Sequence, residues 1–184
     1  MASICRGPSV RRVIGLAWLA IAPSFPAFAQ APVPAPCSAP ESKQFDFWLG
    51  DWKVRWDATP GGQVAGTGRN RIAKILDGCV IEENFSTDQT EPLIGHSVSM
   101  WSPRQKRWLQ TWVDNQGSYL DFVGEFKDGK MILAREGIDA EGEKIRQRMV
   151  FENIAADRFD WRWESSREGA DWTLAWLLHY ERMK

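Results

Sequence analysis

Residues 45–56 read FDFWLGDWKVRW, and the hydrophobic period changes within this stretch. Up to Leu49 the apolar residues recur at i, i+3 and i+4, which predicts one or two helical turns that end at Gly50. From Trp52 to Trp56 apolar and charged residues alternate, which is the pattern of a half-buried β-strand. The stretch therefore predicts a short N-terminal helix that leads directly into a first strand.

Most of the chain after this stretch keeps the period of two. Turn signals divide it into short segments, and Asp128 with Gly129 forms the strongest two-residue hairpin signal. Further strands are expected at about Gln63–Ile75, Cys79–Ser86, Gly95–Trp101, Trp108–Val113, Tyr119–Lys127, Lys130–Gly137, Lys144–Glu152, Arg158–Ser165 and Trp172–Arg182. The connections are too short for crossover helices, and closure of the sheet leaves no exposed edge. We therefore predict an all-β fold, a closed antiparallel up-and-down β-barrel of about ten strands with a short N-terminal helix.

The beginning of the chain has the order of a secretory signal peptide. Three arginines precede an apolar run that is too short for a membrane span, and a small-x-small cleavage site ends at Ala29. We predict a signal peptide over residues 1–29, a Pro- and Ala-rich tether over residues 30–40 and a single β-barrel domain over residues 41–184. The mature protein is then expected to be periplasmic or secreted, without a membrane anchor.

Charge and cysteine content narrow the expected partners. Cleavage after Ala29 lowers Lys plus Arg from 23 to 20 against 24 Asp plus Glu, so the net charge becomes −4. A mildly acidic domain without a basic stripe argues against nucleic acid and against an anionic membrane surface as partners. Cys37 and Cys79 remain as an even pair in an oxidising compartment. They form either one disulfide or two free buried thiols, and we expect the disulfide.

The sequence offers little for catalysis. The chain has two histidines, His96 and His179, and no Gly-x-Ser-x-Gly elbow, so an activated nucleophile is poorly supported. The cysteines and histidines lack the spacing of a metal site, and we expect neither a metal nor a cofactor. Glu82 and Glu83 are neighbours in a predicted strand and point to opposite faces, so we interpret them as ordinary surface charge. We expect a protein that is not an enzyme.

Tryptophan is the unusual feature of the composition, with 11 in the chain. Most recur as same-face pairs: Trp52 and Trp56, Trp108 and Trp112, Trp161 and Trp163, Trp172 and Trp176. These rings either fill the barrel, which then acts through its surface as a structural or interaction protein, or line a cavity for an apolar or aromatic ligand. We expect a real ligand pocket to reach about 300 Å³.

Five residues are the candidate ligand contacts. Gln110 and Gln147 are candidate polar anchors, and Trp112 and Trp161 belong to the aromatic pairs. His96 shares its strand face with Val98 and Met100, so it is expected to point into the barrel, either as a satisfied core histidine or as a ligand contact.

Four segments carry a family resemblance: residues 45–52 (FDFWLGDW), 75–83 (ILDGCVIEE), 108–115 (WLQTWVDN) and 172–182 (WTLAWLLHYER). Together they resemble a family of small exported bacterial proteins of unassigned function, and the likeness covers most of residues 41–184. The resemblance implies a calycin-like, or lipocalin-like, β-barrel.

Within the first segment, Gly50, Asp51 and Trp52 are similar to the Gly-x-Trp that opens the first strand of lipocalins. In those proteins the indole packs under a basic residue from the end of the barrel, and Arg182 is the natural partner here. The resemblance also extends to haem-binding calycin relatives, which ligate iron through a late histidine. A haem-binding barrel that uses His179 or His96 is therefore the alternative function.

Overall fold

The computed structural model describes residues 37–59, 64–167 and 171–184, so the predicted signal peptide and residues 30–36 of the tether lie outside the described residues. Two short 3-10 helices come first, η1 (Pro40–Lys43) and η2 (Asp46–Trp48). The strands are β1 (Gly50–Trp56), β2 (Gly66–Ile75), β3 (Val80–Thr87), β4 (Ile94–Ser102), β5 (Arg107–Asp114), β6 (Tyr119–Lys127), β7 (Lys130–Ile138), β8 (Lys144–Glu152), β9 (Arg158–Arg167) and β10 (Thr173–Arg182). The predicted strands are all present, within a few residues at each end.

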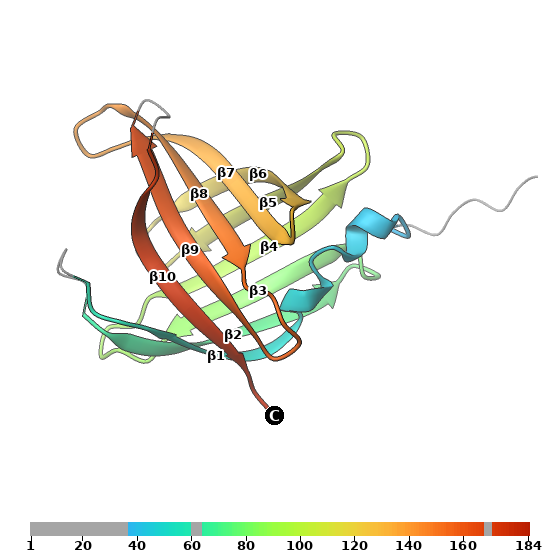
Figure 1. Cartoon of the computed structure of the whole chain (residues 1–184), viewed down its shortest axis with the longest axis horizontal. Helices are drawn as coiled ribbons and strands as arrows, with labels where there is room; N and C mark the ends of the chain where they lie inside the picture. Colours follow the sequence, from blue (N-terminus) through green and yellow to red (C-terminus); the bar gives the residue numbers. More distant parts are fainter. Residues whose placement is uncertain (1–36, 60–63, 168–170) are drawn as a thin grey trace, which may run out of the picture. The chain divides into compact units, whose positions relative to one another are not determined.

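The ten strands form one closed antiparallel barrel in which each strand pairs with its neighbours in sequence (Figure 1). The barrel closes where β1 pairs with β10, from Trp52 opposite Arg182 to Arg55 opposite His179. Asp128 and Gly129 both have positive φ, 51° and 74°, as a two-residue hairpin turn between β6 and β7 requires. The predicted up-and-down barrel is confirmed. No helix among the described residues has both the length and the apolar character needed to cross a membrane.

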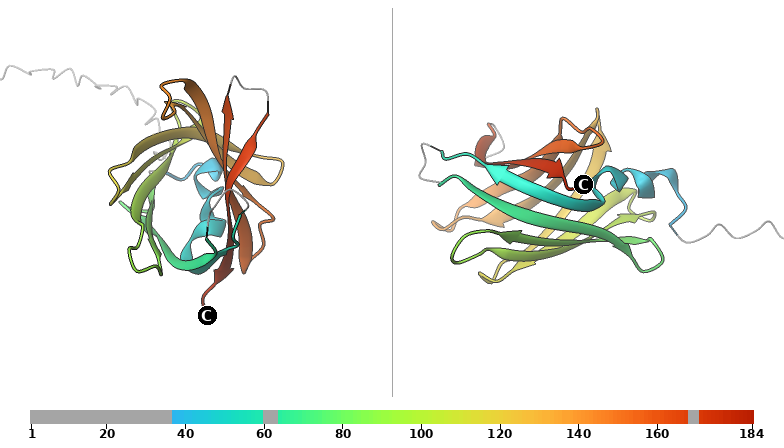
Figure 2. Two further views of the ribbon diagram at one scale, coloured as in Figure 1. Left: turned by 90° about the vertical axis from the view of Figure 1, so that its left-hand side faces the viewer. Right: turned by 90° about the horizontal axis from the view of Figure 1, so that it is seen from below.

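The η1–η2 segment closes one end of the barrel (Figure 2, left). Phe45 is fully buried, and its ring lies 5.2 Å from that of Trp108 and 5.0 Å from that of Phe151. The backbone carbonyl of Trp48 accepts a 2.8 Å hydrogen bond from the indole Nε1 of Trp52. The helical residues of the opening stretch therefore form the hydrophobic plug of the barrel, and the strand residues form its wall.

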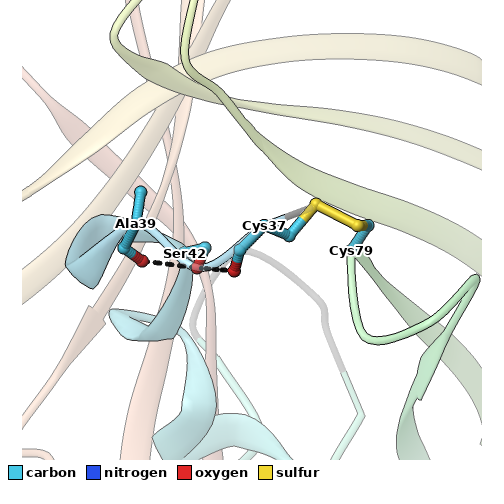
Figure 3. Close-up of a disulfide and its surroundings, with 4 residues drawn as sticks. All are labelled: Cys37, Ala39, Ser42 and Cys79. Carbon is cyan, nitrogen blue, oxygen red and sulfur yellow. Dashed lines mark hydrogen bonds between the residues drawn. A yellow bond between two sulfur atoms is a disulfide. The ribbon is translucent and has the colours of Figure 1, made fainter. Parts of the chain in front are cut away.

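A disulfide holds this plug in place. Cys37 and Cys79 are bonded, with their Cα atoms 5.1 Å apart, so the expected disulfide is confirmed (Figure 3). Cys79 lies in the turn between β2 and β3, and Cys37 lies three residues before the start of η1. The hydroxyl of Ser42 hydrogen-bonds to the Cys37 carbonyl at 2.6 Å and contacts the Ala39 carbonyl. The bond thus ties the start of the domain to the closed end of the barrel, and it is typical of an oxidising compartment.

A β-bulge in β10 overturns one of the tryptophan pairs. The register shifts between Leu174, which lies opposite Glu164, and Trp176, which lies opposite Trp163. Because the extra residue reverses the alternation, Trp176 faces the interior while Trp172 lies under Arg148, 4.0 Å from ring centre to guanidinium carbon. The expectation that Trp172 and Trp176 share a face is therefore wrong.

Candidate functional site

A cavity of about 220 Å³ lies inside the barrel and borders the η1–η2 plug, whose Trp48 contributes to its lining. More than half of the lining residues are aromatic, and the rest are apolar except for three carboxyl or amide side chains. The lining consists of Trp48, Glu83, Phe85, Leu93, Gln110, Trp112, Asp114, Leu120, Phe122, Met149, Phe151, Trp161, Trp163, Trp176, Leu178 and Tyr180. Both uses expected for the tryptophans are thus present, since Trp52 and Trp108 are buried in the core while Trp112 and Trp161 line the cavity.

The aromatic wall is built from ordered ring contacts. Trp161 and Trp163, successive inward residues of β9, lie parallel with an interplanar angle of 5° and ring centres 6.3 Å apart. Trp176 meets Trp161 edge-on at 6.1 Å, and Phe122 meets Trp163 edge-on at 5.8 Å. These four rings form a continuous apolar surface contributed by β6, β9 and β10.

Trp112 owes its position to a glycine on the neighbouring strand. A Cβ atom on Gly95 would lie 2.0 Å from the Trp112 ring, so only glycine leaves room for the indole. The indole Nε1 donates a 2.9 Å hydrogen bond to Asp114 at the end of β5. Burial disfavours ionisation of Asp114, but hydrogen bonds from Trp112 and from the Ser118 backbone outweigh it and hold its pKa below the usual value.

The main polar group of the cavity is the buried carboxyl of Glu83. Asn70 Nδ2 donates to Glu83 Oε1 at 2.7 Å, and Ser97 Oγ donates to Oε2 at 2.5 Å. The same Asn70 nitrogen donates to the hydroxyl of Tyr180 at 3.1 Å. These four residues come from β2, β3, β4 and β10, so the closed barrel is what brings them together.

Burial raises the pKa of Glu83 to about 7, even though the hydrogen bonds from Ser97 and Asn70 favour the ionised form. Burial also raises the pKa of Tyr180, and the nearby Glu83 carboxylate adds to that rise. Glu83 therefore changes its charge near neutral pH, while Tyr180 stays a neutral phenol. The interpretation of Glu83 as ordinary surface charge is wrong.

A second polar group, Gln110, lies on the inner face of β5. Its Nε2 donates a 2.8 Å hydrogen bond to Ser99 Oγ, while its Oε1 is buried without a partner. Only 3% of the Gln110 surface is exposed. The cavity wall therefore presents an unsatisfied carbonyl oxygen beside the aromatic rings.

No Lys, Arg or His lines the cavity within the described part of the chain. Arg135, on the same face of β7 as the buried Leu133, donates from Nη1 to Gln147 Oε1. Gln147 is thus engaged by Arg135 and does not line the cavity. The other predicted contacts on inner faces, Gln110, Trp112 and Trp161, do line it.

Both histidines point away from the cavity. The His96 side chain is 43% exposed and lies 3.2 Å from Asn84 Oδ1 and 3.8 Å from Glu82, on the outer face. The expectation that His96 points into the barrel is wrong, because Ser97 and Ser99 of the other face are buried against Glu83 and Gln110. His179 is bound to Asp160 at 2.7 Å and also faces outward. Neither imidazole can ligate a haem held inside the barrel.

At the closed end, the structural pair predicted from the Gly-x-Trp motif is present. The guanidinium carbon of Arg182 lies 4.1 Å from the ring centre of Trp52. Gly50 has φ of 119°, and a Cβ there would lie 2.5 Å from Arg182 Nη1, so both backbone and packing require glycine. This contact lies beside the plug, and neither residue lines the cavity.

Glu83 is the site residue that sequence reasoning missed. It shares its strand face with Ile81 and Phe85, which are both buried, and this alternation was visible in the sequence. The partners that make its burial tolerable lie on other strands, and no local pattern identifies them.

Comparison with known proteins adds no assignment: no protein-family model and no curated protein matches the chain.

Proposed function

We propose that this chain is an exported, non-catalytic binding protein that holds a small apolar or aromatic molecule inside its barrel. The observation that carries the proposal is the aromatic cavity with its few buried polar groups, the usual composition of a small-molecule site. Binding is favoured over catalysis because Asn70 and Ser97 already occupy both oxygens of the Glu83 carboxylate.

The size of the cavity restricts the ligand. At about 220 Å³ it does not reach the expected 300 Å³ and falls below the pockets that hold drug-sized molecules. It exceeds the roughly 150 Å³ apolar cavity that admits benzene. The proposed ligand is therefore a compact molecule of one or two rings, and a long acyl chain does not fit.

The place of the protein in the cell belongs to the same proposal. The pattern of residues 1–29 supports a signal peptide, followed by a tether over residues 30–40 and one barrel domain over residues 41–184. The Cys37–Cys79 disulfide supports a periplasmic or secreted location. The FDFWLGDW stretch and the Trp52–Arg182 contact support membership of the calycin-like exported family.

The two alternatives have less support. A haem-binding barrel lacks an inward-facing histidine, because His96 and His179 lie on the outer surface. A barrel filled throughout, acting only through its surface, does not account for the cavity or for the partnerless Gln110 oxygen.

The test is tryptophan emission during titration with one-ring and two-ring aromatic compounds. We expect a saturable change in emission, because several indoles line the cavity, and Trp112→Ala should weaken it. Trp172→Phe is the matched control, since that ring lies under Arg148 outside the cavity and its loss should leave the ligand response unchanged. No saturable response from any compound in the panel would reject the proposal.

A further inference from the structure

We infer that the molecule held in this barrel is an aromatic compound that carries an N–H or O–H donor and no negative charge. The inference rests on the proposed function and specifies the chemistry of its ligand. Three features of the wall carry it: a partnerless acceptor on Gln110, the acidic pair Glu83 and Asp114, and the absence of a cation from the described lining residues.

The acceptor is the Oε1 atom of Gln110. A buried carbonyl oxygen normally has a hydrogen-bond partner, and one left without a partner disfavours the empty state. In the structure the amide is oriented with its Nε2 donating to Ser99 Oγ at 2.8 Å, which leaves Oε1 without a partner. A ligand that donates to this oxygen supplies the missing bond, whereas a ligand of the same shape without a donor leaves the oxygen buried and unsatisfied.

The charge of the wall excludes anions. Glu83 and Asp114 both line the cavity, and the groups that contact the Glu83 carboxyl are the neutral side chains of Asn70 and Ser97. The Arg135 guanidinium, on the inner face of β7, does not line the cavity: its Nη1 donates to Gln147, and its Nε is buried without a partner. A carboxylate ligand would therefore meet like charge, with no cation among the described lining residues to offset it.

The aromatic rings of the cavity wall indicate the shape of the ligand. Trp161 and Trp163 present parallel faces, and Trp176 stands edge-on to Trp161, so a planar ring can stack against one indole and contact the edge of another. The Nε1 atoms of Trp48 and Trp176, two lining residues, are also buried without a partner. A neutral acceptor on the ligand, in addition to its donor, is therefore compatible with the site.

Three bicyclic probes of nearly the same shape separate these requirements. Indole has an N–H donor, benzofuran has an ether oxygen in its place, and indene has only carbon and hydrogen. Titration calorimetry at pH 8 should show indole binding about threefold to tenfold more tightly than benzofuran or indene. Indole-2-carboxylate should bind at least about tenfold more weakly than indole, because it brings a negative charge beside Glu83.

The variant Gln110→Met keeps the volume of the side chain and removes the acceptor. It should lower the affinity for indole to that for indene while leaving indene binding unchanged, and the indene titration also shows that the variant is folded. Equal binding of the three neutral probes, tighter binding of benzofuran, or tight binding of the carboxylate would overturn this inference and leave the proposed function standing. Failure of all three neutral probes to bind would instead overturn the proposed function.

Discussion

The guanidinium of Arg182 covers the indole of Trp52 at 4.1 Å and joins the last strand of the barrel to the first. Its Nη1 donates to the Leu49 carbonyl at 2.6 Å and its Nη2 to the Phe47 carbonyl at 3.1 Å. One side chain therefore fastens β10 to the plug and to the start of β1.

The first prediction concerns this contact. Arg182→Met should lower the free energy of unfolding by about 2–4 kcal/mol, since it removes a cation–π contact and leaves the carbonyls of Leu49 and Phe47 without their donor. Arg182→Lys should recover less than half of the loss, because an ammonium group does not reproduce the planar fork. Urea unfolding measures both.

Arg71→Met is the control for Arg182, since the Arg71 side chain is 76% exposed and forms only a 4.0 Å ion pair with Asp51. It should change stability by less than about 0.5 kcal/mol. An equal loss in the two variants would show that Arg182 contributes no more than a surface charge.

The second prediction is a pH dependence of stability set by Glu83. Its pKa is about 7 in the folded protein and 4.5 in the unfolded chain. Below pH 4.5 the carboxyl is neutral in both states. Between pH 4.5 and 7 the unfolded chain loses this proton before the folded protein does, so the free energy of unfolding falls as pH rises. Above pH 7 the reduction is complete and amounts to about 3 kcal/mol.

Glu83→Gln should remove this slope, because the amide is neutral at every pH and still offers an oxygen to Asn70. Unfolding free energies measured at pH 4.5, 6 and 8 should show that the stability of the variant relative to the wild type increases as pH rises. The control variant Glu82→Gln, on the outer face, should show the same pH dependence of the unfolding free energy as the wild type. A stability gain of Glu83→Gln over the wild type that grows as pH falls would contradict the raised pKa of Glu83.

The third prediction tests how Trp112 is placed. Gly95→Ala puts a methyl group where the Trp112 ring now lies, 2.0 Å away, so the indole must leave its position. We expect a loss of about 1–3 kcal/mol and a changed near-ultraviolet circular dichroism spectrum. Ile94→Ala, at an exposed neighbouring position, should leave that spectrum unchanged. An unaltered spectrum for Gly95→Ala would mean that Trp112 does not pack over Gly95.

The fourth prediction concerns the Cys37–Cys79 disulfide, which spans 42 positions of the chain. Its loss should lower stability by about 2–4 kcal/mol, because the unfolded chain regains the freedom that the cross-link removes. Cys37→Ser, Cys79→Ser and the double variant should unfold at the same urea concentration, since each removes the same bond. Additive losses in the double variant would show that the thiols stabilise the fold separately.

Much of the fold follows from local pattern, but the face that each strand turns inward does not. In β4 the alternation placed His96, Val98 and Met100 on one face, and this more apolar face lies outward, with Val98 and Met100 about 40% exposed. The serine face is inside because Glu83 and Gln110 on the adjacent strands need hydrogen-bond partners. The bulge in β10 similarly separated Trp172 from Trp176.

The amino-acid sequence by itself determined the all-β class, the strand order, the short N-terminal helix and the cysteine pair. These depend on periodicity, turn residues and short motifs, which act over a few neighbouring positions. Only the tertiary structure decided that Glu83 is buried, that Gln110 has a free oxygen and that Gln147 is engaged by Arg135. Those properties depend on partners from other strands, and closure of the barrel is the step that brings the partners within hydrogen-bond distance.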